Sequence, residues 1–169
     1  VLLREQFLAS KKGRETRLTY LPLLMKTVVM GLKEHPLMNA SLDEANGVIQ
    51  LKQYYNIGIA THTPEGLLVN VVRDVDKKGV LELATEITQL TETALEGKAK
   101  LENLRDGTFT ITSLGTLGGI AATPIINYPE VAVLAVHRIS KRPVVRDDQV
   151  VIRHMMNLSL ASDHRVVDG

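Results

Sequence analysis

The sequence contains no cysteine among its 169 residues. This absence excludes disulfide bonds, thiolate metal sites and a cysteine nucleophile, because each of them needs a thiol. It is compatible with a reducing cytoplasm. Tryptophan is also missing, and aromatic residues make up only 4% of the chain. Platforms for stacking nucleic-acid bases therefore have little support.

The sequence also lacks an excess of charge and a long hydrophobic run. Lys and Arg number 20 against 19 Asp and Glu, which leaves a net charge of +1. A near-neutral chain without basic clusters gives no electrostatic reason to expect nucleic acid as a partner. No apolar run reaches the ~18 residues of a membrane span, because Lys26 interrupts the longest candidate, over 18–32. We expect neither nucleic acid nor a membrane as a partner.

Apolar residues make up 44% of the chain and charged residues 23%, which is an ordinary globular mixture. The length suits one domain with a real core. Both ends look cut, because residues 1–6 resemble the inside of a helix and residues 166–169 stop on a turn signal. We therefore expect a fragment, or the ordered part, of a longer chain.

The hydrophobic pattern predicts both helices and strands. Apolar spacing predicts a helix over 21–32, with Thr19 as its N-cap and Pro22 in its first turn, and another helix over 80–94. Asn46-Gly47 predicts a hairpin turn. The remaining predictions are a helix over 1–12, strands over 40–43, 48–52, 57–61, 67–72, 108–113, 131–136 and 150–162, and a hairpin tip at 146–148. This order predicts one α/β layered domain with a mixed sheet.

The first candidate for chemistry is the final heptad, Asp163-His164-Arg165-Val166-Val167-Asp168-Gly169, which follows the last predicted strand. Histidine is the side chain best suited to move a proton near pH 7. Asp168, four residues after His164, is close enough to shape the loop by pairing with an arginine or accepting backbone N–H bonds. The alternative is an ordinary polar turn, and spacing alone favours that alternative.

The second candidate is the segment 108–119, in which alternation puts Thr108, Thr110 and Thr112 on one face. Hydroxyls at the end of a strand are able to donate to a developing oxyanion, and the glycines that follow let a ligand approach the backbone. The spacing matches neither a dinucleotide fingerprint nor a phosphate-binding P-loop. The alternative is a solvent-facing threonine ladder followed by a loop.

The other histidines give weaker signals. His154 shares a predicted strand face with apolar residues, so we expect it in the core, and His137 follows a predicted buried strand. His35 lies at a helix end and His62 before a turn. No pair has the spacing of a metal site, and we expect no metal.

Together these motifs resemble those of the dihydrolipoamide acyltransferases, the E2 catalytic cores of 2-oxoacid dehydrogenase complexes. The heptad resembles the signature D-H-R-x-x-D-G, which chloramphenicol acetyltransferases and condensation domains share in part. The further resembling segments are Pro36–Ser41 (P-x-x-N-A-S), Asn56–Ala60 (N-I-G-I-A), Gly66–Val69 (G-L-I-V), Gly107–Thr112 (G-T-F-T-I-S/T) and Pro124–Ala132 (P-I-I-N-x-P-E-V-A). The whole set, in this order, is specific to the acyltransferases.

The resemblance implies a two-layer chloramphenicol acetyltransferase-like α/β domain, with a mixed β-sheet packed against helices. The domain would cover residues 1–169, truncated at both ends, with the lipoyl and subunit-binding domains absent. Homotrimers would build a larger hollow core, cubic or icosahedral. The E1 decarboxylase and the E3 dihydrolipoamide dehydrogenase would bind through the missing subunit-binding domain. We expect a cytoplasmic location, or the mitochondrial matrix in a eukaryote.

The implied reaction moves an acyl group between the thiols of dihydrolipoamide and coenzyme A, both of them substrates, with the lipoyl group carried outside this chain. A free thiol has a pKa of about 8.5, so His164 would act as the base that makes the thiolate. The Thr112 hydroxyl would donate to the oxyanion, contributing about 3 kcal/mol, and Asp168 would fix the loop. Without cysteine, direct transfer between two bound thiols is what remains. His164 and Thr112 would face each other across a subunit interface and lie far apart in one chain.

Six positions match the family's coenzyme A contacts: Thr19, Thr91, Ser113, Thr116, His137 and Ile139. Four positions depart from the family's pattern: Asn70 stands where proline is usual, His62 where aspartate is common, His137 where glycine is usual, and Asp106 where a first glycine is common. Two alternatives stay open: a catalytically silent scaffold of the same fold, and a small-molecule O-acetyltransferase. The acyl group, acetyl or branched-chain, is also open.

Overall fold

The computed structural model describes residues 4–5, 8, 18–113 and 119–168. Its centre is a five-stranded sheet in the order β4-β3-β5-β6-β9. These strands are β3 (Ile57–Thr63), β4 (Gly66–Val72), β5 (Phe109–Ser113), β6 (Ala132–Val136) and β9 (Leu158–Ser162). Strands β3, β5 and β6 run parallel, whereas the edge strands β4 and β9 are antiparallel to their neighbours. The predicted mixed sheet is confirmed.

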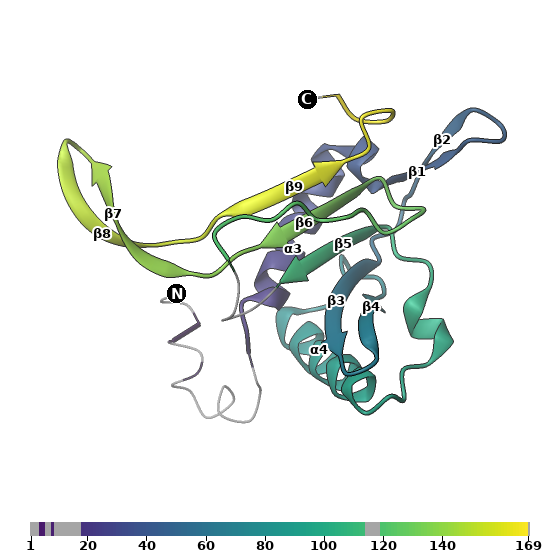
Figure 1. The fold of residues 1–169 in the computed structure, drawn as a ribbon, viewed down its shortest axis with the longest axis horizontal. Coiled ribbons are helices and arrows are strands. Elements are labelled where there is room, and N and C mark those ends of the chain that lie inside the picture. Colours follow the sequence, from purple (N-terminus) through teal and green to yellow (C-terminus); the bar gives the residue numbers. More distant parts are fainter. Residues whose placement is uncertain (1–3, 6–7, 9–17, 114–118, 169) are drawn as a thin grey trace.

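Two helices, α3 (Leu21–Glu34) and α4 (Val80–Leu95), cover one face of this sheet (Figure 1). Apolar side chains of both helices and of alternate strand positions form one buried cluster, which includes Met25, Leu83, Ile57 and Ile111. Burial of such side chains provides the main stabilisation of the fold. The fold is therefore a helix layer on a sheet layer, as the α/β prediction stated.

The helix ends follow from local sequence. Pro22 lies in the first turn of α3, where a missing N–H is harmless. The predicted N-cap at Thr19 is wrong by one residue, because Tyr20 occupies that position and the Thr19 hydroxyl accepts only a long bond of 3.4 Å from the Leu21 N–H. Helix α4 is followed by Gly97, whose φ of 69° is in the left-handed region. A short 3₁₀ turn follows each of these helices, η1 (Pro36–Asn39) after α3 and η2 (Leu101–Leu104) after α4.

Two hairpins extend away from the sheet in opposite directions (Figure 1). One is formed by β1 (Ala40–Asp43) and β2 (Val48–Leu51), joined by the predicted Asn46-Gly47 turn. The other, formed by β7 (Ser140–Arg146) and β8 (Gln149–Met155), turns at the predicted tip. We call the β7–β8 hairpin the arm.

The predicted single strand over 150–162 is wrong. The chain breaks between Met155 and Leu158, because β8 pairs with β7 in the arm whereas β9 pairs with β6 in the sheet. Asn157 lies at this break, and its side chain donates a hydrogen bond of 2.7 Å to the Ile120 carbonyl, which fixes the chain there. The expected helix over 1–12 lies largely outside the described residues.

Two expectations about burial are also wrong. Thr108 and Thr110 are buried, so the threonine row is not a solvent-facing ladder. His154 is exposed rather than in the core, because it lies on the arm, whose two strands are separate from the central sheet in the described part of the chain. Among the described residues, no helix combines the length and apolar character needed to cross a membrane.

Candidate active site

His164 lies in a tight turn directly after β9. The Asp163 carbonyl accepts hydrogen bonds from the N–H groups of Val166 and Val167, at 2.9 and 3.0 Å, which close the turn. The Asp163 N–H donates to the Val131 carbonyl at 2.8 Å. Val166 is buried against Ala40 and Val131. The turn is therefore fixed at its base and at its far side, and it presents the His164 side chain to solvent.

Charged groups flank His164 on both sides in sequence. The Arg165 guanidinium donates to the Asp163 carboxylate through Nη2, at 2.7 Å, and through Nε, at 3.0 Å. These hydrogen bonds hold the pKa of Asp163 below its ordinary value. Arg165 also pairs with Glu44, Nη1 to Oε1 at 3.0 Å. Asp168 is exposed and forms no hydrogen bond with the described part of the chain, so its predicted role in fixing the loop stays a prediction.

Thr112 lies at the opposite end of the sheet from His164. It is half-buried on β5, between Ala60 of β3 and Ala135 of β6. Ala135 in turn pairs with Ser159 of β9, five residues before His164. Strand spacing and rise place Thr112 and His164 roughly 15–20 Å apart. One chain does not bring the two predicted catalytic groups together, in agreement with the expectation of a site between subunits.

Four of the six predicted coenzyme A residues line one cavity of about 520 Å³. They are Thr19, Ser113, His137 and Ile139. The cavity lies between the start of α3 and the ends of β5 and β6, on the Thr112 side of the sheet. Its other lining residues are Arg4, Tyr20, Leu21, Leu24, Val136, Arg138 and Met156. Thr91 lies on α4 and does not line this cavity, and Thr116 lies outside the described residues.

His137 is the buried ionisable group of this cavity, with only 6% of its surface exposed. Its Nε2 atom lies 2.9 Å from the Ser159 hydroxyl, and its backbone N–H donates to the Asn157 carbonyl. Arg4 lies over the Tyr20 ring, and Arg138 is exposed beside His137. Apolar walls with guanidinium groups among the lining residues suit a long ligand with an anionic part.

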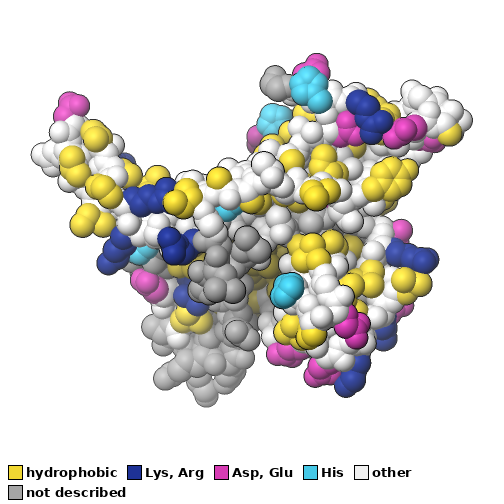
Figure 2. All heavy atoms as spheres, in the orientation of Figure 1, with side chains coloured by type: hydrophobic (Ala, Val, Ile, Leu, Met, Phe, Trp, Pro, Cys, Tyr) yellow, Lys and Arg dark blue, Asp and Glu magenta, His cyan; other side chains and the backbone are white. Residues whose placement is uncertain are grey.

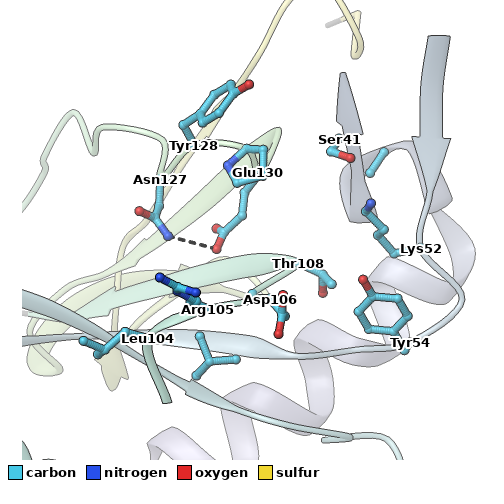
Figure 3. Close-up of a pocket in the computed structure, with 14 residues that line it drawn as sticks. Ser41, Lys52, Tyr54, Leu104, Arg105, Asp106, Thr108, Asn127, Tyr128 and Glu130 are labelled. Carbon is cyan, nitrogen blue, oxygen red and sulfur yellow. Dashed lines mark hydrogen bonds between the residues drawn. The ribbon is translucent and has the colours of Figure 1, made fainter. Parts of the chain in front are cut away.

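A second cavity, of about 340 Å³, surrounds a residue that sequence reasoning did not single out, Glu130 (Figure 3). Glu130 is 6% exposed, and its Oε1 atom accepts a hydrogen bond of 3.2 Å from the Asn127 amide. The Oε2 atom is buried without a partner among the described residues, and burial raises the pKa of the carboxyl. Gly107 gives this carboxylate room, because a Cβ there would lie 2.7 Å from Oε1. The sequence signal was present only as part of the P-E-V-A segment.

The described residues contain no group of three or more histidine, aspartate or glutamate side chains that is able to hold a metal ion.

The family model of the 2-oxoacid dehydrogenases acyltransferase (catalytic domain) matches residues 1–169. A curated relative is the dihydrolipoyllysine-residue acetyltransferase component of the pyruvate dehydrogenase complex from Staphylococcus epidermidis. The two are 42% identical over 166 residues, which are 98% of this chain and 38% of the relative. The chain thus spans about two fifths of the length of the curated relatives it matches.

Solved structures show the same likeness. The dihydrolipoamide acetyltransferase of Azotobacter vinelandii superposes with a TM-score of 0.95 at 43% identity, over 99% of this chain and 69% of that one. The cubic core of a pyruvate dehydrogenase multienzyme complex gives the same TM-score, identity and coverage. A chloramphenicol acetyltransferase superposes with a TM-score of 0.53 at 13% identity, over 89% of this chain and 71% of that one, which supports the expected fold alone.

Proposed function

The chain belongs to the 2-oxoacid dehydrogenase acyltransferases, as their catalytic domain, and we propose that it moves an acyl group between dihydrolipoamide and coenzyme A. The observation that carries this proposal is the 520 Å³ cavity at the Thr112 end of the sheet, which gathers four side chains predicted from sequence to contact coenzyme A. Those four come from three separate parts of the chain. Their convergence on one cavity was not implied by their spacing.

The proposed chemistry assigns a role to each end of the sheet. His164 takes the proton from the attacking thiol, and the thiolate adds to the carbonyl carbon of the thioester. The resulting oxyanion accepts a hydrogen bond from the Thr112 hydroxyl of a neighbouring copy. Collapse of this intermediate expels the second thiolate, which takes the proton back from His164. No covalent acyl-enzyme is involved.

A site made by two copies requires association. The arm favours it, because Val145 and Val150 are each 74% exposed and Ile152 is 69% exposed, an apolar surface on a thin hairpin (Figure 2). We propose a homotrimer as the unit of a larger hollow core, with the cubic particle as the first expectation from the structural relative. The E1 and E3 components and the lipoyl group belong to this proposal through domains outside the chain. A cytoplasmic location also stays a prediction.

Of the two acyl groups left open by the sequence, we propose acetyl, because the curated relatives are acetyltransferase components. The test compares acetyl- and isobutyryl-coenzyme A as donors to dihydrolipoamide, using the full-length protein and its His164→Ala variant. We expect acetyl transfer that the substitution lowers by about 10²–10⁴-fold. A rate that the substitution leaves unchanged would overturn the mechanism. An assembled particle without transfer would favour the scaffold, and transfer to a hydroxyl acceptor alone would favour the O-acetyltransferase.

A further inference from the structure

Arg165 connects the His164 turn to a hairpin far away in sequence. Its guanidinium contacts the Asp163 carboxylate at three distances, 2.7, 3.0 and 3.2 Å, and the Glu44 carboxylate at 3.0 Å. Glu44 lies in the turn between β1 and β2. Asp163 also accepts the backbone N–H of Arg165, at 3.0 Å. The two neighbours of His164 are thus bonded to each other by backbone and side chain, and one of them is tied to the hairpin.

We propose that Arg165 is a positioning residue for His164, and that Glu44 of the β1–β2 turn holds Arg165 in that role. The proposal rests on the proposed function, since it assigns His164 the part of the base. Arg165 acts on His164 in two separable ways, one geometric and one electrostatic.

The geometric effect concerns the turn itself. The Arg165 side chain folds back onto Asp163 and spans the peptide unit that carries His164. A paired guanidinium fork of this kind adds orientation as well as attraction. The imidazole is exposed, so the turn rather than side-chain packing sets its direction. A base displaced by about 1 Å loses on the order of 10²-fold in rate.

The electrostatic effect concerns the carboxylates on the elements that meet at this end of the sheet. Asp163 and Asp168 belong to the same segment, Asp43 and Glu44 belong to the β1–β2 hairpin packed beside it, and Glu130 precedes β6. Arg165 is the cation bonded to two of them. A carboxylate left unpaired near a histidine favours the imidazolium, which is unable to accept a proton. By pairing with two of these carboxylates, Arg165 therefore keeps the His164 imidazole able to accept a proton.

Three variants of the full-length protein separate these effects. Arg165→Gln removes the charge and the fork, Arg165→Lys keeps the charge and removes the fork, and Glu44→Gln removes the hairpin's hold. The first readout is the pH profile of kcat/KM for acetyl transfer. The second is the rate at which diethyl pyrocarbonate modifies His164 across pH, followed by peptide mass spectrometry, which needs no enzymatic activity.

We expect Arg165→Gln to lower kcat about 10-fold or more with little change in KM. It should also move the midpoint of both pH profiles upward, because unpaired carboxylates favour the protonated imidazole. Arg165→Lys should lower kcat while the midpoints stay in place. Glu44→Gln should lower kcat about 2- to 3-fold, because an exposed ion pair contributes little. Lys98→Gln, which alters an exposed lysine paired with Glu96 just after α4, is the control and should change neither readout.

The outcomes also separate this inference from the proposed function. An active wild type whose Arg165→Gln variant keeps its kcat and both midpoints would overturn the inference and leave the function standing. A wild type without acyl transfer would overturn the function, and the modification midpoints would still decide the electrostatic part. Arg165→Lys and Arg165→Gln could instead lose kcat equally, with no shift of either midpoint. That result would support the geometric effect and overturn the electrostatic one.

Discussion

The two ends of the central sheet hold an ionisable site by different means. At the end of the sheet where β9 finishes, His164 is exposed, and hydrogen bonds and ion pairs hold its turn in place. At the opposite end, His137 is buried in the wall of a cavity and bonded to Ser159. The first end presents a reactive group without a pocket around it, and the second presents a pocket without the proposed base. Under the proposed function, the two ends would act together only between copies of the chain.

The difference matters because an exposed reacting group and a buried binding-site group respond differently to substitution. An exposed group held by surface ion pairs depends on a few weak interactions, whereas a buried group depends on packing and on a satisfied hydrogen bond. Substitutions at the first end should therefore change rate more than stability. Substitutions around His137 and in the sheet between the two ends should change affinity or stability, apart from Thr112, whose hydroxyl is assigned to the reaction.

The largest expected effect is on the rate of acetyl transfer, in which His164 of one copy would act with Thr112 of another. His164→Ala and Thr112→Val should each lower acetyl transfer by about 10²-fold or more. Particles assembled from a mixture of the two variants should regain a substantial part of the activity, because some interfaces combine an intact His164 with an intact Thr112. The measurement is the specific activity of co-expressed variants. Mixed particles no more active than the separate ones would show that both groups act within one chain.

The next effect concerns the strands that fix the distance between the ends. A Cβ on Gly58 would lie 2.6 Å from the Thr110 hydroxyl and 2.8 Å from the Val69 side chain. Gly58→Ala should therefore destabilise the fold by about 1–3 kcal/mol. Gly31→Ala on α3 is the matched control, since nothing lies within 4 Å of its new Cβ, and it should stabilise by roughly 0.5–1 kcal/mol. Chemical denaturation of both variants measures the two free energies, and equal values would contradict the expectation.

A smaller effect is expected at the cavity end. Ser159→Ala removes the hydroxyl that lies against His137 Nε2 and leaves the cavity walls in place. The KM for coenzyme A should rise about 3- to 10-fold while kcat changes little, since the residue helps to shape a binding site. Ser140→Ala, at the base of the arm, is a serine control. A fall in kcat with an unchanged KM would place His137 in the reaction rather than in binding.

The smallest effect concerns Glu130, the buried carboxylate at the His164 end. Its raised pKa means that the folded state keeps its proton to higher pH than the unfolded chain, so stability from this group falls as pH rises above the ordinary glutamate value. Glu130→Gln should raise the free energy of unfolding by about 1 kcal/mol near pH 7. The gain should vanish near pH 4, where both states hold the proton. Thermal unfolding at the two pH values measures it, and a gain independent of pH would exclude the ionisation as its cause.

Periodicity and turn signals predicted most of the fold. The Asn46-Gly47 turn, the helix with Pro22 in its first turn and the strands β3, β5 and β6 lie where the pattern predicted them, whereas their order and direction in the sheet were not predicted. The pattern failed at the break between β8 and β9, because apolar alternation continues through it and only partner choice divides the strand. His154 was misplaced for the same reason, since alternation does not tell a two-stranded arm from a covered sheet.

The candidate site was predictable where residues match known motifs and not where it depends on contacts. Motifs identified Thr19, Ser113 and His137, which share a cavity. Sequence spacing gave no sign that Glu44 meets Arg165, because 121 residues separate them and each resembles an ordinary surface charge. The unpartnered oxygen of Glu130 was equally invisible, since burial arises only from the packed fold.

The arm has a consequence for the timing of assembly. Its two strands pair only with each other among the described strands, and a lone two-stranded hairpin is at best marginally stable in water. Its amide hydrogens should therefore exchange with solvent quickly in a dilute single copy and slowly once copies associate. The rate of amide hydrogen exchange at β7 and β8, measured against protein concentration, would therefore report association without any substrate.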